Sequence, residues 1–479
     1  MVKRSSSSGD VVGSTLDPES HRKQNSSGDQ YAGLDQFGRV VNQQWVNGTG
    51  SISDLFIYAY DSNGNVTAKD NLLDLAYSQT FTYDQLNRLT GSTLGGAANQ
   101  SWNLDAQGNW SSFTSNGTTQ TETANAQNQI TSISGGTTPT YDANGNLISG
   151  SLPGQPAGSE ATLFYDAWNR LVKVTNSSGT VIAQYSYDAR NYRVTETYPQ
   201  GGTGIPAGTT NYIYYDAQWQ AIETRTNGTA ASNVTSQMVW SAAYVNAAVL
   251  QDTYSGGTLQ ADSRIYFQQD ANWDTTAIVG YNSTTGTWNV VQRYTYSPYG
   301  TITVLNADWS TPPTGTNPIV DNLYQGMALD PVTGLYYSRN RNYSPSLGVW
   351  ISQDPAGYIN GADTYQFVLS NPVGNADPEG LWNWSDVLPW NWNWSWLPWV
   401  GKALPKAAQY MVPGSEFCAG AQALGNLPKA GGLANLRMQY DLLHGIDYTK
   451  DPLYTGLMKV STGQTLTPAE KQALLNTQK

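Results

Sequence analysis

The sequence predicts a mainly β protein, built from an antiparallel sheet of repeated hairpins and followed by a small, mostly α-helical C-terminal tail. Three observations support this prediction. The 479-residue chain contains 47 Gly and 31 Tyr, and only 13% of its residues are charged, a composition unlike that of an average enzyme. Residues that suit half-buried strands and tight turns dominate positions 44–381, where a tyrosine–aspartate motif recurs. The composition changes abruptly after residue 381.

The first 43 residues are predicted to be a disordered segment. They are rich in serine, as in the stretches 5–10 and 25–30, and have almost no large apolar residues to offset the entropy of ordering. Lys3 and Arg4 precede serines, so no secretory signal peptide is visible, and no apolar run of about 18 residues could span a bilayer. We expect secretion or a cell-surface location by another route, or a cytoplasmic location if the chain is a fragment.

The sequence has few features expected of a metal-binding or nucleic-acid-binding protein. Cys418 is the single cysteine, which excludes an intramolecular disulfide and any cysteine-based zinc site. We expect neither a cofactor nor a metal. The 36 acidic residues outnumber the 24 basic residues, for a net charge of −12. This excess argues against nucleic-acid binding by the body of the protein, because phosphate contacts need Lys and Arg.

A short motif recurs from residue 60 onward, with about 20 to 24 residues between adjacent copies. A repeat of this length is typical of stacked architectures. The clearest copies begin at Tyr60, Tyr83, Leu104, Tyr141, Tyr165, Tyr187 and Tyr215, and a worn copy begins at Ala124.

Each repeat is interpreted as a β-hairpin. A strand ends in Tyr, an aspartate and an Asn-Gly or Asn-Arg pair form the turn, and a second strand opens on Leu, Val or Ile. The aspartate accepts hydrogen bonds from turn amides, and Asn or Gly tolerates the positive φ of the reversal. Since an isolated hairpin is marginally stable, we expect the hairpins to pair edge to edge in one long sheet.

This Tyr-Asp unit resembles the YD repeat of the Rhs and teneurin class. The resemblance implies that residues 44–265 form a β-sheet that spirals into a hollow shell, in which the tyrosines and aspartates are structural. An alternative use of an aromatic, Asn-rich β surface is the binding of cell-surface carbohydrate, although the sequence marks no particular groove.

Residues 266–381 resemble the Rhs repeat-associated core domain. The motifs of that domain occur in the expected order, at 266–279, 293–300, 333–341, 352–355 and 377–381. In that family the core closes the shell and acts as an intramolecular aspartyl protease, cutting after the Leu of Asp-Pro-x-Gly-Leu. The resemblance implies that Asp354 and Asp377 are the carboxylate pair, that Arg341 supports them, and that Leu381–Trp382 is the scissile bond.

The residue types suit that chemistry. Two carboxylates held close together cannot both ionise easily, so one can act as an acid while the other activates water. A guanidinium beside them can stabilise the ionised group. The alternative is structural: Asp-Pro commonly opens turns, and Arg341 could be an ion-pair partner. One departure is the sequence Gly348-Val349-Trp350, where the family usually has Gly-Arg-Phe and so a further positive charge.

The tail, residues 382–479, contains seven of the 17 Trp of the chain, all between Trp382 and Trp399. Their alternation with polar residues has the period of a strand with one aromatic face. That face could plug the inner wall of the shell or anchor at a membrane surface. Residues 402–411, 430–443 and 467–475 are predicted to be short helices.

The tail has no toxin active site that its sequence identifies. His444 could serve as a general base with Asp441 or Asp447, but a lone histidine in a loop is more often structural or exposed. It is therefore a weak candidate for the activity of the tail.

These observations favour a bacterial Rhs-type protein whose shell encapsulates its own C-terminal tail and releases it by self-cleavage after Leu381. The family implies a role in contact-dependent competition or toxin delivery, with an immunity protein as a further partner. One alternative is a non-enzymatic cell-surface adhesin or carbohydrate-binding scaffold. Another is an inactive gene fragment, because the roughly 340 residues of repeats and core are short for a complete shell.

Overall fold

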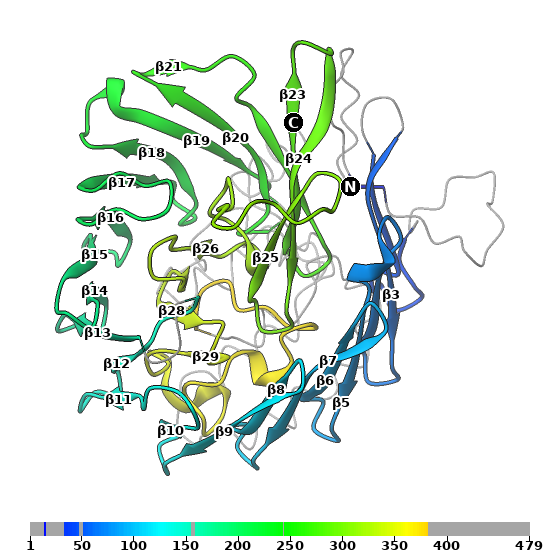
Figure 1. Ribbon diagram of the computed structural model, residues 1–479, viewed down its shortest axis with the longest axis vertical. Helices are drawn as coiled ribbons and strands as arrows, with labels where there is room; N and C mark the ends of the chain where they lie inside the picture. Colours follow the sequence, from blue (N-terminus) through cyan, green and yellow to red (C-terminus); the bar gives the residue numbers. More distant parts are fainter. Residues whose placement is uncertain (1–13, 16–32, 47–50, 155–158, 243, 382–479) are drawn as a thin grey trace, which may run out of the picture. The chain divides into compact units, whose positions relative to one another are not determined.

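The computed structural model describes residues 14–15, 33–46, 51–154, 159–242 and 244–381 (Figure 1). The chain divides into two units, Met1–Trp390 and Asn391–Lys479. All described residues belong to the first unit. The Trp-rich stretch, the predicted helices of the tail and His444 lie outside the described residues. Among the described residues, no helix has the length and apolar character needed to cross a membrane.

Ten antiparallel strands form the first sheet, each hydrogen-bonded to the next in sequence order. They are β1 (Ser14–Thr15), β2 (Asn42–Val46), β3 (Ile52–Tyr60), β4 (Val66–Asn71), β5 (Gln79–Tyr83), β6 (Leu89–Leu94), β7 (Ala97–Leu104), β8 (Trp110–Ser115), β9 (Thr118–Ala124) and β10 (Ile130–Ile133).

A second sheet continues the same pattern with fifteen strands, of which β21 pairs only with β20. They are β11 (Thr140–Tyr141), β12 (Leu147–Ser151), β13 (Glu160–Tyr165), β14 (Leu171–Thr175), β15 (Val181–Tyr187), β16 (Arg193–Tyr198), β17 (Thr209–Tyr215), β18 (Ala221–Thr226), β19 (Val234–Trp240), β20 (Ala248–Ser255), β21 (Thr258–Leu259), β22 (Ile265–Gln269), β23 (Thr275–Asn282), β24 (Thr287–Tyr296) and β25 (Ile302–Asn306). This ladder crosses the boundary predicted at residue 266 without a break.

The expected single long sheet is thus two sheets in the described residues. The break falls between β10 and β11, which have only four and two residues. Gly135, Gly136 and Pro139 lie between them. Glycine weakens a strand and proline has no N–H to donate to a ladder, so pairing ends here.

A third, four-stranded sheet lies among the long sheets in Figure 1. It consists of β26 (Ala328–Leu329), β27 (Tyr336–Ser338), β28 (Arg341–Ser344) and β29 (Val349–Trp350). Five short 3₁₀ turns complete the described structure: η1 (Leu75–Tyr77), η2 (Ala231–Asn233), η3 (Tyr324–Gly326), η4 (Gly357–Asn360) and η5 (Val368–Ser370).

The repeated aspartate organises each hairpin turn as expected. Asp84 Oδ1 accepts hydrogen bonds from the amides of Leu86 and Arg88 at 2.9 and 3.0 Å, and Asp84 Oδ2 accepts one from Arg88 Nε at 2.7 Å. Asn87 supplies the positive φ of 61°. A side chain in the fifth position likewise donates to the aspartate in the turns that begin at Asp35, Asp61, Asp105, Asp142 and Asp166.

The turn at Asp35 lies within the segment that the sequence predicted to be disordered. Its phenylalanine and arginine amides donate to Asp35 Oδ1 at 2.9 and 3.0 Å, and a β-bridge joins Leu34 to Val40. The repeats therefore begin before residue 44. This copy has Leu34 where most copies have Tyr, as the copy at Leu104 does.

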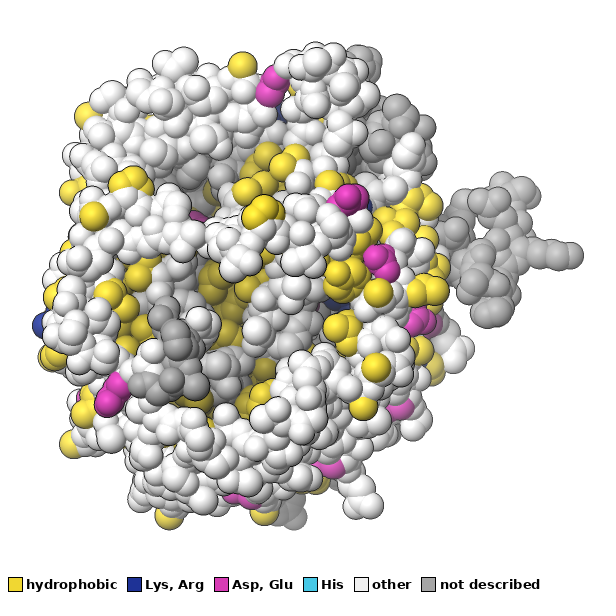
Figure 2. Space-filling model, viewed as in Figure 1, with side chains coloured by type: hydrophobic (Ala, Val, Ile, Leu, Met, Phe, Trp, Pro, Cys, Tyr) yellow, Lys and Arg dark blue, Asp and Glu magenta, His cyan; other side chains and the backbone are white. Residues whose placement is uncertain are grey.

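The third sheet contributes to both hydrophobic clusters of the described chain. Tyr343 and Trp350 pack with residues of the first sheet such as Trp102, whereas Leu347 and Ile351 pack with residues of the second sheet. Apolar packing on two sides therefore fixes the position of β26–β29. On the face of the molecule shown in Figure 2, most side chains are uncharged and the acidic ones are scattered.

Candidate active site

Arg341 begins β28 directly after a tight turn from β27, and its side chain is buried. Ser338 and Arg341 are paired across this turn, in which Arg339 has a positive φ of 48°. The Arg341 guanidinium lies over the Trp350 ring of β29, with its Cζ atom 4.3 Å from the ring centroid. Trp350 thus gives the buried cation an aromatic face on which to stack.

Asp354 and Asp377 converge on this guanidinium. Arg341 Nη2 lies 3.2 Å from Asp354 Oδ2 and 3.3 Å from Asp377 Oδ2. The side chains of the three residues are only 1%, 6% and 0% exposed, respectively. Burial lowers the pKa of Arg341, although both carboxylates oppose that shift. The structure therefore brings together the three residues that the sequence singled out.

The segment that ends at Leu381 lies along the turn between β27 and β28. Ser338 Oγ donates to the carbonyl oxygens of Asp377 and Pro378 at 3.0 and 2.8 Å, and Arg341 Nε donates to that of Gly380. Gly380 has a φ of +65°, and a Cβ atom there would lie 2.6 Å from the carbonyl oxygen of Ser338. The glycine of the Asp-Pro-Glu-Gly-Leu motif is thus required for this close approach.

Leu381 lies within hydrogen-bonding distance of the same cluster. Its amide donates to Asp377 Oδ1 at 3.1 Å, and its carbonyl oxygen accepts a hydrogen bond from Asn360 Nδ2 at 3.3 Å. Trp382, on the other side of the predicted scissile bond, lies outside the described residues. The carbonyl oxygen of that bond and Asp354 Oδ2 share one hydrogen-bond donor, Asn360 Nδ2.

Sequence reasoning missed two polar residues near this site. Asn360 contacts Leu381, and Asp363 is a half-buried carboxyl group whose pKa is raised by burial to about 6. Arg341 Nη1 also donates to the carbonyl oxygen of Thr364 at 3.1 Å. None of these residues belongs to a motif with a recognisable spacing, and only the folded loop after Asp354 brings them to the site.

Comparison with known proteins agrees with the repeated turns. The family model described as Teneurin YD-shell matches residues 19–373, well over half of the chain. The chain belongs to this family. The predicted mainly β, antiparallel fold is confirmed.

Several curated toxins are similar to this YD-shell chain. The tRNA nuclease WapA of Bacillus subtilis strain 168 is 28% identical over 313 residues, which are 63% of this chain and 12% of the relative. Toxin subunit YenC1 of Yersinia entomophaga is 37% identical over 98 residues, 20% of this chain and 9% of the relative. Double-stranded DNA deaminase toxin A of Burkholderia cenocepacia strain H111 is 26% identical over 257 residues, 50% of this chain and 16% of the relative. The chain therefore spans a small part of each relative's length.

Solved structures show the same fold. The crystal structure of TcdB2–TccC3 matches with a TM-score of 0.55 and 21% identity, over 72% of this chain and 18% of that chain. The Photorhabdus luminescens Tc holotoxin pore matches with a TM-score of 0.54 and 20% identity, over 72% and 17%. At this identity the likeness concerns the fold alone.

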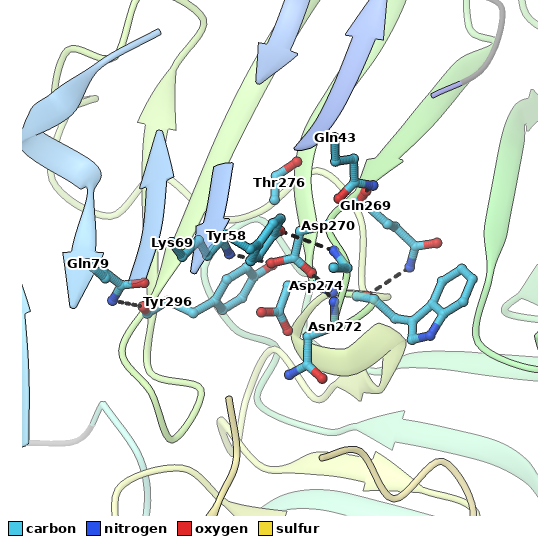
Figure 3. Close-up of polar contacts among 12 residues, drawn as sticks. Gln43, Tyr58, Lys69, Gln79, Gln269, Asp270, Asn272, Asp274, Thr276 and Tyr296 are labelled. Carbon is cyan, nitrogen blue, oxygen red and sulfur yellow. Dashed lines mark hydrogen bonds and ion pairs between the residues drawn. The ribbon is translucent and has the colours of Figure 1, made fainter. Parts of the chain in front are cut away.

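A second buried carboxylate pair of this YD-shell protein has a different setting. Figure 3 shows Lys69 and Tyr58 directed toward Asp270 and Asp274. Lys69 Nζ forms an ion pair with Asp270, and Asp274 Oδ1 accepts a hydrogen bond from the Gln325 amide at 2.8 Å. Burial raises the pKa of Asp274 well above its usual value, reinforced by the charge of Asp270 and opposed by Lys69.

This second pair lines a cavity of about 30 Å³, which has room for about one water molecule. Its contacts join β4, the turn between β22 and β23, and η3. We interpret it as structural, since its hydrogen bonds are those of a repeat turn with a lysine added. Among the described residues, no group of three or more His, Cys, Asp or Glu is placed to hold a metal ion.

Proposed function

We propose that this YD-shell protein encapsulates its own residues 382–479 and releases them by cutting its Leu381–Trp382 bond. The observation that carries the proposal is that one buried guanidinium nitrogen contacts both Asp354 and Asp377, beside the backbone of Leu381. Relatives named as a nuclease, a deaminase toxin and a toxin subunit favour an effector as the released part. The biological role would be contact-dependent competition or toxin delivery, from a secreted or cell-surface location.

The proposed reaction is hydrolysis of one peptide bond. One carboxylate takes a proton from a water molecule as the water oxygen bonds to the carbonyl carbon of Leu381. The other carboxyl, protonated at the start, supplies a proton, and the departing nitrogen of Trp382 leaves as an amine. The products are a Leu381 carboxyl group and a free amino group on Trp382. Arg341 stabilises whichever carboxylate is ionised.

Proximity explains why such a site needs no substrate pocket. The bond to be cut belongs to the same chain and is positioned by Ser338, Arg341 and Gly380 before any chemistry begins. Because folding has already fixed the reacting groups, the activation free energy of a well-oriented intramolecular reaction can be lower by about 7–11 kcal/mol. One turnover per molecule is sufficient for release.

The test is the intact mass of the purified chain and of the variants Asp354→Asn and Asp377→Asn. We expect the wild type to yield a 98-residue fragment that begins at Trp382, and both variants to remain whole. Asp274→Asn is the matched control, because it changes a buried carboxyl outside the site and should leave cleavage intact. A wild type that stays uncut would overturn the proposal.

The effector role is tested separately by producing residues 382–479 alone in bacteria. We expect growth to stop, and to resume when the product of a neighbouring gene is supplied as an immunity protein. Normal growth without that product would contradict an effector role for the tail, whatever the outcome of the cleavage experiment.

A further inference from the structure

The carboxamide of Asn360 links the carbonyl group of Leu381 to the carboxylate of Asp354. Its Nδ2 atom lies 3.3 Å from the carbonyl oxygen of Leu381 and 3.3 Å from Asp354 Oδ2. Its Oδ1 atom is buried and has no hydrogen-bond partner in the described part of the chain. A buried acceptor atom without a hydrogen bond costs free energy, although the Asn360 residue as a whole is only partly buried. The two contacts made by its nitrogen therefore call for a functional explanation.

The loop after Asp354 holds Asn360 in this position. The Asp354 amide donates to the carbonyl oxygen of Thr364 at 3.0 Å and closes the loop. At its start, Asp354 Oδ1 accepts a hydrogen bond from the Ala356 amide at 2.8 Å. Asn360 is the last residue of η4, and Gly361 follows it with a φ of +144°. The backbone that carries the amide is thus fixed to the same aspartate that the amide contacts.

The guanidinium of Arg341 already donates to other oxygen atoms. Arg341 donates through Nε to Gly380, through Nη1 to Thr364, and through Nη2 to the two carboxylates. Within the described residues, the donor on the carbonyl oxygen of Leu381 is Asn360. When water adds to this carbonyl, the negative charge that develops on its oxygen needs such a donor.

We propose that Asn360 is a further catalytic residue of the self-cleavage, one that positions the Leu381 carbonyl and stabilises the oxyanion formed on it. This inference rests on the proposed autoproteolysis. Its second contact, with Asp354 Oδ2, keeps that carboxylate beside the carbonyl carbon during the attack. The role requires a side chain that donates hydrogen bonds at this position, and a side chain of similar size that only accepts cannot fill it.

The experiment follows the appearance of the 98-residue fragment over time after a pulse of cell-free translation of the full chain. Asn360→Asp keeps the size of the side chain and removes the donor, and it should slow cleavage about 100-fold or more, as does the loss of an oxyanion donor in other hydrolytic enzymes. Asn360→Gln retains the donor on a longer arm and should recover part of the rate. Asn144→Asp, in an exposed repeat turn, should cleave like the wild type.

The outcomes separate the two proposals. If the wild type cuts and Asn360→Asp cuts at the same rate, the role of Asn360 is wrong while autoproteolysis stands. If the wild type does not cut, autoproteolysis itself is wrong. Thermal unfolding of each variant is measured in the Asp354→Asn background, where no chain is cut. The inference is also contradicted if Asn360→Asp and Asn360→Gln have the same unfolding midpoint and cut at the same rate. The presence of a hydrogen-bond donor would then make no difference to cleavage.

Discussion

At the scale of single residues, the candidate site depends on burying one cation with two carboxyl groups. Arg341 is 2% exposed, and a buried charge is tolerated only when it is paired and hydrogen-bonded. Arg341 Nη2 contacts both carboxylates, so the two aspartates share one positive charge. Trp350 lies against the guanidinium and shields it from water.

Replacing Arg341 by lysine tests the importance of the guanidinium fork. A lysine keeps the positive charge but cannot contact Gly380, Thr364 and both aspartates at once. We expect Arg341→Lys to slow cleavage about 100-fold, the scale of losing a preorganised charged donor. The measurement is the fraction of chain cut as a function of time after translation. A rate equal to that of the wild type would show that charge alone suffices.

Replacing Asp274 by asparagine should stabilise the protein at neutral and alkaline pH. The pKa of Asp274 is raised in the folded state, so its favourable contribution is full below the unfolded value near 4 and is lost as the pH rises through the raised value. Asparagine donates to Asp270 at every pH, as Asn65 does to Asp61. We expect about 1 kcal/mol of added stability at pH 8.

The check is the unfolding midpoint of the wild type and Asp274→Asn at pH 5 and pH 8. The gain should be larger at pH 8 than at pH 5, because the stabilising contribution of the wild-type carboxyl is progressively lost as the pH rises from its unfolded pKa through its raised folded pKa. An asparagine variant that is less stable than the wild type at pH 8 would contradict a raised pKa of Asp274.

Residue-level prediction from the sequence had a clear limit. Asp354, Asp377 and Arg341 stand in motifs with a family resemblance, and the structure places them together. Asn360 could not be found in this way, because its contact with Leu381 depends on how the loop from Asp354 to Thr364 folds back. The spacing of residues in the sequence does not reveal which side chains a folded loop brings together.

At the scale of elements, the repeat turn is the unit of construction. The aspartate of each turn binds two amides and usually a donor in the fifth position, as Asp84 does with Arg88. Burial alone would raise the pKa of Asp84, but the hydrogen bonds from Arg88 and Leu86 outweigh it, and the pKa is lowered. The turn at Asp84 therefore loses stability as the pH falls, the opposite of Asp274.

Removing this aspartate should weaken its hairpin. Asp84→Ala deletes the acceptor for two amides and one guanidinium, and we expect a loss of about 2 kcal/mol. Leu86→Ala is the matched control in the same turn, because Leu86 is 66% exposed and its side chain stabilises little. Chemical denaturation of both variants gives the comparison. Equal losses in the two variants would contradict the role of the aspartate.

The hairpins were predictable because the turn chemistry repeats visibly in the sequence. The break between β10 and β11 was not predicted, since it depends on two very short strands losing their pairing. The third sheet was also not predicted as a separate element, because β26–β29 are two to four residues long. Strands of that length carry too few residues to show an alternating pattern.

At the scale of the whole molecule, the candidate site depends on contacts between distant parts of the chain. Gly348, between β28 and β29, has a φ of +67°, and a Cβ atom there would lie 2.2 Å from Trp110 of the first sheet. Tyr365 Oη donates to the carbonyl oxygen of Gly145, in the turn between β11 and β12 of the second sheet, at 2.6 Å. The segment that carries Arg341 and Asp354 is thus held by both long sheets.

Gly348→Ala should therefore impair cleavage from a distance. Gly117→Ala is the control, since Gly117 also has a positive φ, of +80°, but has nothing within 4 Å of its Cβ position. Both variants carry a similar backbone strain of about 1 kcal/mol, so the difference between them isolates the clash with Trp110. We expect slower cleavage and a lower unfolding midpoint for Gly348→Ala alone. Equal cleavage rates and unfolding midpoints for the two variants would contradict the role of the close contact between Gly348 and Trp110.

The most direct test of the account is the mass of the two products when the full chain is translated in water enriched in heavy oxygen. Hydrolysis at the Leu381–Trp382 bond predicts one heavy oxygen atom in the new carboxyl group of residues 1–381. Residues 382–479 should also carry one, in the Lys479 carboxyl group, because water releases the finished chain from tRNA. Asp354→Asn and Asp377→Asn should give the uncut chain. An uncut wild type, or a cut at another bond, would contradict a self-cleaving site built from Asp354, Asp377 and Arg341.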